Sequence, residues 1–155
     1  MSEQDRQDNV NRRQSIVLRR ATLAMLTVLL CQYGIGIGVN LYVAIPSGHP
    51  TNGAGPGFVR ALSQGAPALV AHVVVGFCLI AGAVAIVALA ASANHKGALA
   101  AAIVGLAALI AALFSGATFV ASGEDADSLA MALFAGVAML SYGVALFVSH
   151  ADRGL

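Results

Sequence analysis

One histidine stands where a titratable side chain is unusual. His72 lies about five residues inside the second of four long apolar runs, and apart from tyrosines and cysteines it is their only titratable group. An ionisable residue inside a membrane span is a functional hypothesis by default. Three roles are open: a neutral histidine that hydrogen-bonds to Asn40 or Ser115 and fixes helix register, an axial haem ligand, and a proton or quinone site.

Polar side chains at one depth predict a belt around this histidine. Counted from the expected external helix ends, Asn40, His72, Ser115 and Thr118 lie at a similar level in the first, second and third runs. Each of these groups costs several kcal/mol when buried without a partner, so we expect them to share hydrogen bonds in the outer half of the bundle. In the haem alternative, Met131 in the fourth run is at the right depth for a second iron ligand. On the cytoplasmic half, Gln32, Ser141 and Tyr142 are polar but less clustered.

Other candidate chemistry is weaker. His49, His95 and His150 have no cysteine or carboxylate at metal-ligand spacing, so we predict no metal site. Asp125 and Asp127 suit the first turn of the fourth run, where acidic residues favour the helix dipole. Since no nucleophile–base pair can be assembled, an enzyme is less expected than a protein without catalytic activity.

Composition places these residues in a membrane. The 155 residues are 59% hydrophobic and only 10% charged, with a mean hydropathy of +0.85. Soluble domains carry about 25% charged residues, so this chain cannot cover a water-facing surface. The net charge of +1 excludes a basic face for nucleic acid. Cys31 and Cys78 both fall in apolar runs, where we expect buried thiols and no disulfide framework.

The apolar runs predict an all-α, four-helix transmembrane bundle. Each run holds about 22 to 25 residues without Asp, Glu, Lys or Arg, enough to cross about 30 Å of hydrocarbon. Small residues four apart, such as Gly34 with Gly38 and Ala101 with Gly105, predict close helix packing. The expected division of the chain is a flexible basic tail 1–20, a membrane domain 21–149 with spans 21–45, 67–91, 98–121 and 128–149 and an external loop 46–66, and a tail 150–155.

The basic residues predict the orientation. All eight lysines and arginines except Arg60 fall on one side of the expected spans. The positive-inside rule then puts both termini in the cytoplasm, with an up-down-up-down topology in the plasma or inner cell membrane. The basic tail acts as a topology signal, with contact to anionic lipid as the alternative.

Three segments carry a resemblance to known proteins. The segment 40–50, NLYVAIPSGHP, together with Phe114–Phe119 and Met131-Ala132, resembles an uncharacterised family of small four-helix membrane proteins of actinobacterial type. That resemblance implies the fold and no activity. More loosely, the chain is similar to one half of the haem A synthase bundle, which has a histidine on its second and fourth helices. His72 matches the first of these, but the outer half of span 128–149 has no histidine.

Three functions follow, in order of preference. The first is a non-enzymatic accessory or assembly partner of a membrane complex, with no cofactor. The second is a membrane redox protein that binds haem b or quinone through His72, with Met131 as the second haem ligand. The third is a small oligomeric transporter, which ranks last because no span contains a carboxylate. The expected partners are the lipid bilayer and other membrane proteins or a second copy of the chain, and no nucleic acid.

Overall fold

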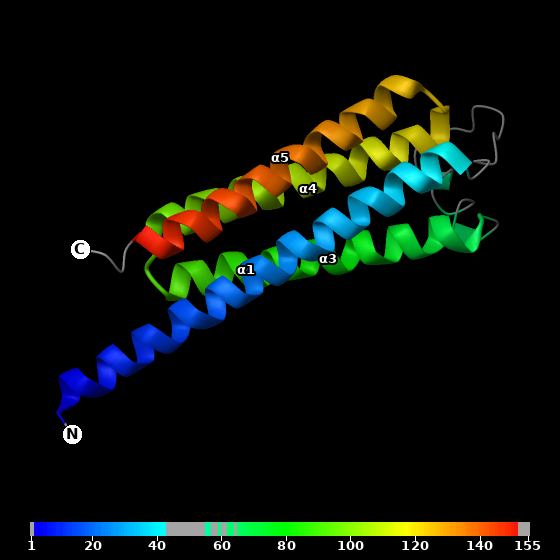
Figure 1. The fold of residues 1–155 in the computed structure, drawn as a ribbon. Coiled ribbons are helices and arrows are strands. Elements are labelled where there is room, and N and C mark those ends of the chain that lie inside the picture. Colours follow the sequence, from blue (N-terminus) through cyan, green and yellow to red (C-terminus); the bar gives the residue numbers. More distant parts are fainter. Residues whose placement is uncertain (1, 43–54, 57–58, 60–61, 64, 152–155) are drawn as a thin grey trace.

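The chain is helical almost throughout the part that the structure describes. The computed structural model describes residues 2–42, 55–56, 59, 62–63 and 65–151, and within these ranges it has four long helices and no strand (Figure 1). The helices are α1 (Glu3–Tyr42), α3 (Pro67–Ser92), α4 (Lys96–Ser122) and α5 (Asp125–Ala151). The predicted all-α class with four long helices is therefore confirmed. Most of the expected external loop 46–66, with His49 and Arg60, lies outside the described residues, as does Arg153.

All four helices are long and apolar enough to cross a membrane. The shortest, α3, has 26 residues, and about 20 suffice for the hydrocarbon core. The predicted helices at 67–91, 98–121 and 128–149 agree with the observed bounds to within three residues. The sequence pattern therefore locates these three helices correctly.

The helix ends follow local chemistry. Pro67 occupies the first turn of α3, where its missing N–H is not needed. Helix α4 ends at Gly123, which has the left-handed φ of 73° that glycine adopts without strain, and whose N–H donates to the Phe119 carbonyl at 2.7 Å. Asp125 and Asp127 lie in the first turn of α5, as predicted.

Helix α1 is longer than predicted. Residues 3–20, expected as a flexible tail, are helical and continuous with the first span. A capping box starts the helix: the Ser2 N–H donates to the Asp5 carboxylate at 2.9 Å, and the Asp5 N–H donates to the Ser2 hydroxyl at 3.2 Å. Leu18 is buried, so packing holds the helix from that residue onward. The preference for a tail rested on charge, which does not prevent an unbroken helix.

This cap predicts a pH effect at the start of α1. The pKa of the Asp5 carboxyl lies below its usual value of 3.8 because the hydroxyl and the backbone of Ser2 stabilise the ionised form. The cap therefore contributes fully to the stability of the helix at pH values above the usual pKa. This contribution is lost as the pH falls through the lowered pKa. Amide hydrogen exchange should show fraying of the first turn at acidic pH. Ser2→Ala removes the hydroxyl but keeps the backbone N–H, so it should weaken this pH dependence; an unchanged dependence would contradict the role of the hydroxyl in the cap.

The four helices form a ring. Helix α1 packs against α3 and α5, and α4 packs against the same two helices, while neither diagonal pair makes close contacts among the described residues. The contact between α4 and α5 is the most extensive. Large side chains from all four helices fill the interior: Leu18, Met25, Leu29, Leu79, Ile86, Leu109 and Tyr142.

The glycines differ in how closely a neighbouring helix approaches them. A Cβ atom on Gly105 would lie 2.9 Å from the Tyr142 ring, so α4 and α5 approach closely there. The expectation for Gly34 and Gly38 is wrong for the described part of the chain, where nothing lies within 4 Å of a Cβ built on either. Spacing shows which residues share a face, but not which face meets a neighbour.

Candidate functional site

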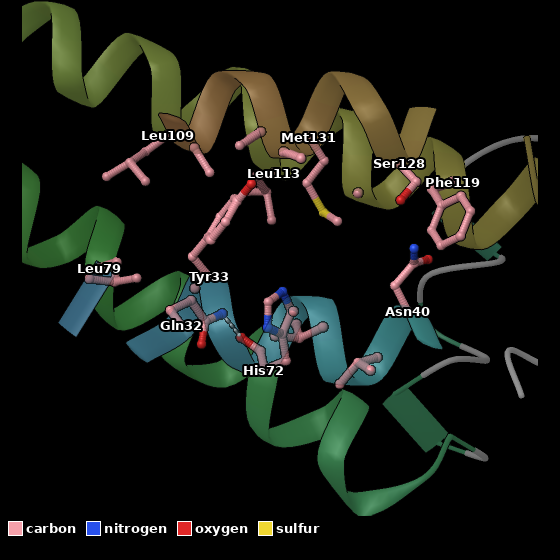
Figure 2. A pocket seen from close by; sticks show the side chains of 18 of the residues that line it. Gln32, Tyr33, Asn40, His72, Leu79, Leu109, Leu113, Phe119, Ser128 and Met131 are labelled. Carbon is pink, nitrogen blue, oxygen red and sulfur yellow. Dashed lines mark hydrogen bonds between the residues drawn. The ribbon is translucent and has the colours of Figure 1, made fainter. Parts of the chain in front are cut away.

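A cavity of about 200 Å³ opens between the four helices (Figure 2). Its lining comes from α1, α3, α4 and α5 and is mostly aliphatic. The polar exceptions are Gln32, Tyr33, Asn40, His72 and Ser128. Figure 2 shows Asn40, Ser128 and Phe119 at one end of the cavity and Leu79 and Leu109 at the other. An apolar cavity with a few convergent polar groups is the usual form of a small-molecule site.

His72 is held against α1 by a glycine. A Cβ atom on Gly36 would lie 2.9 Å from His72 Cε1, so the imidazole lies directly on the α1 backbone. The Nδ1 atom of His72 is buried and has no hydrogen-bond partner among the described residues. The predicted partners Asn40 and Ser115 therefore do not satisfy this nitrogen.

Gln32 supplies a second unsatisfied atom. Its side chain is 8% exposed, and its Nε2 donates to the His72 backbone carbonyl at 2.5 Å. The oxygen Oε1 is buried and unpartnered in the described part of the chain. Because the amide nitrogen is engaged with a carbonyl, the free atom is the acceptor. Unsatisfied polar atoms of this kind are rare in proteins and require an explanation.

Met131 lies on the opposite wall. A Cβ atom on Gly116 would lie 2.9 Å from the Met131 sulfur, so α4 leaves room for this side chain. Figure 2 shows Met131 across the cavity from Gln32 and His72. The two residues considered as haem ligands thus face one space.

The size of that space does not fit haem. An apolar cavity of about 150 Å³ accommodates a single benzene ring. The cavity here, about 200 Å³, has room for one substituted ring and not for a macrocycle of four pyrroles. His72 and Met131 have suitable donor atoms, but the volume between the helices favours a smaller ligand.

The predicted polar belt is only partly brought together. Asn40 and His72 line the cavity, whereas Ser115 and Thr118 do not. The Thr118 hydroxyl donates within its own helix, to the carbonyls of Phe114 at 3.2 Å and Ser115 at 2.9 Å. A threonine in a helix can satisfy its hydroxyl in this way without a neighbour.

Gln32, which lies outside the predicted belt, carries one of the two buried, unpartnered atoms found among the described residues that line the cavity. The spacing Gln32–Gly36–Asn40 places all three residues on one face of α1 and was the signal for it. Tyr33 and Ser128 also line the cavity and had no comparable signal.

The other titratable residues form no cluster. Among the described residues, no group of three or more His, Cys, Asp and Glu side chains could hold a metal ion. His95 is the N-cap residue of α4, and its Nε2 lies 3.2 Å from the Ser15 hydroxyl of α1. Cys31 and Cys78 are free thiols, but they are exposed on the outside of the bundle rather than buried as expected. In an apolar run both faces of a helix are apolar, so composition does not separate core from lipid-facing positions.

Comparison with known proteins adds no relative. No family model matches the chain, and neither the curated proteins nor the solved structures contain a match to it.

Proposed function

We propose that this chain is a multi-pass protein of the plasma or inner cell membrane that binds a hydroxylated single-ring lipid of the quinol class between its helices. The helices run up-down-up-down, with both termini in the cytoplasm. The observation that carries the proposal is the pair of buried, unpartnered atoms, Gln32 Oε1 and His72 Nδ1, beside one apolar cavity.

The free atoms define the chemistry of the ligand. Gln32 Oε1 accepts hydrogen bonds only, so the ligand must donate. A quinol ring carries hydroxyl donors on an otherwise apolar body, and a single ring matches the volume of about 200 Å³. The oxidised quinone has carbonyls in place of these hydroxyls and leaves Gln32 unsatisfied. The cavity is partly open to the outside of the bundle, which leaves a path for an apolar tail.

The lining supports binding rather than catalysis. Among the described residues it contains no carboxylate and no cysteine, and the buried Nδ1 atom of His72 has no partner that would polarise the ring. We therefore assign the protein a role as a non-enzymatic accessory of a membrane complex, one that holds a quinol for another component.

The test compares the reduced and oxidised forms of a short-tailed benzoquinone bound to protein in lipid nanodiscs. The reduced form should bind more tightly, and Gln32→Leu should weaken its binding up to about tenfold, because one hydrogen bond contributes about 0.5–1.5 kcal/mol. Thr118→Val, outside the cavity, is the control and should leave binding unchanged. Equal binding of both forms, or unchanged binding in Gln32→Leu, would refute the proposal.

A glycine pair on α1 tests the position of His72. Gly36→Ala places a methyl group against the imidazole, which must then move, so we expect weaker quinol binding in a folded protein. Gly38→Ala adds the same methyl group where no described residue lies within 4 Å and should have no effect on binding. Equal losses in both variants would mean that His72 does not contact the ligand.

A further inference from the structure

We propose that the rim of the bundle where α1 leaves it binds the headgroup of an anionic phospholipid through Arg19, Arg20 and Lys96. This inference rests on the membrane insertion in the proposed function but not on the cavity or its ligand. It assigns the basic end of the protein a specific binding role in addition to setting the orientation of the chain.

Cationic side chains from two segments meet at one level. The apolar run of α1 begins at Ala21, immediately after Arg19 and Arg20. The contact of 3.2 Å between the Ser15 hydroxyl and His95 brings the turn before α4 next to this part of α1. Lys96, the first residue of α4, follows directly and is exposed. The rim therefore collects positive charge where phospholipid headgroups lie.

Arg19 is the central residue of this rim. Its Nε atom is buried and has no hydrogen-bond partner among the described residues. Helical side chains lean towards the helix N-terminus, so Arg19 covers the turn that contains Ser15. A guanidinium group binds phosphate oxygens in a bidentate manner, which a phospholipid phosphate can satisfy.

The start of α4 adds a favourable field. Its first turn contains no acidic residue, and its N-cap side chain makes no capping hydrogen bond. No negative side chain therefore compensates the positive end of the α4 dipole, which lies at Lys96.

The surface beside the rim favours a lipid over a free phosphate ion. Leu23 follows Arg19 by four residues, and Leu30 follows Leu23 by seven, so all three share one face of α1. The two leucines are 53% and 56% exposed. A phosphate site at Arg19 thus adjoins an apolar strip along which the acyl chain of a lipid can lie. A free phosphate ion would use only the site at Arg19 and not the strip.

The arginines nearer the N-terminus of α1 show how the contribution to lipid binding should depend on distance from the rim. Arg12 and Arg13 precede Arg19 and Arg20 by seven residues, or about 10 Å of helix, which is about one Debye length. Arg6 lies a further two turns out, beyond the reach of the headgroups. Contributions to lipid binding should therefore decrease from Arg19 to Arg13 to Arg6.

Native mass spectrometry of the protein in neutral detergent provides the test, with equal amounts of phosphatidylglycerol and phosphatidylcholine. We expect preferential retention of phosphatidylglycerol. Arg19→Gln and Lys96→Gln should each reduce that preference about fivefold, the effect of one cation near an anionic surface. Arg6→Gln is the matched control and should leave it unchanged.

Several outcomes would overturn the proposal. These are equal retention of the two lipids, an equal loss in Arg6→Gln and Arg19→Gln, and displacement of the lipid by inorganic phosphate at constant ionic strength. If Arg19→Gln does not fold, the exposed Lys96→Gln must show the loss by itself. Gln32→Leu should retain the lipid preference, which separates this proposal from that of the quinol site.

Discussion

Replacing Gly105 with alanine is expected to destabilise the bundle by about 1–3 kcal/mol, the usual cost of an extra methyl group in a packed core. A Cβ atom at this position would lie 2.9 Å from Cε2 and Cζ of Tyr142. The Tyr142 side chain is fully buried, so its rigid ring has no free space into which to rotate. Either α4 and α5 must separate or the ring must leave its rotamer, and both disturb the most extensive helix contact in the protein.

Thermal or SDS-induced unfolding in detergent, followed by circular dichroism, measures this effect. Gly136→Ala on α5 is the matched control, because nothing lies within 4 Å of its Cβ position. That control should be neutral or stabilising, since alanine favours a helix over glycine by up to about 1 kcal/mol. Equal stability of the two variants would show that Tyr142 does not pack on Gly105.

Tyr142→Phe is expected to stabilise the protein by about 1–3 kcal/mol, the cost of one buried unsatisfied polar group. The Tyr142 hydroxyl is buried and has no hydrogen-bond partner among the described residues. Phenylalanine retains the ring against Gly105 and removes only this oxygen. The variant should therefore keep the packing and lose the penalty.

The same unfolding measurement distinguishes the alternatives. Tyr33→Phe removes a hydroxyl that lies beside the cavity and should change stability much less. A loss of stability in Tyr142→Phe would mean that the hydroxyl is held, for example by a buried water molecule. Combining Tyr142→Phe with Gly105→Ala should retain the cost of the glycine substitution, because the ring and its contact remain.

Much of the fold was predictable, because the length of an uninterrupted apolar segment is a strong indicator of a long helix. Three predicted apolar segments agree with the observed helices, and the turn that contains Gly123 and precedes Asp125 follows from residues with clear local preferences. Helix α1 was harder. Residues 3–20 are mostly polar, and only the capping box at Ser2 and Asp5 indicates a helix start so early.

The candidate site was harder to predict, because the level of a residue along its helix does not show which face of the helix carries it. Asn40, His72, Ser115 and Thr118 share a level, but only the first two line the cavity. Gln32 lies further from the Tyr42 end of α1 and still reaches His72, because a glutamine side chain is long and Gly36 lets the two helices approach. Hydrogen bonds within a helix, as at Thr118, cannot be seen from spacing alone.

The continuity of α1 has a mechanical consequence. Its 40 residues form a rod about 60 Å long, which carries Gln32 and Gly36 beside the cavity and continues beyond the bundle to Glu3. The helix is uninterrupted from Glu3 to Tyr42, so a small tilt at the cavity becomes a larger displacement at the far end. Any shift of α1 that accompanies the filling or emptying of the cavity is therefore amplified at its outer end, where a neighbouring protein could sense it.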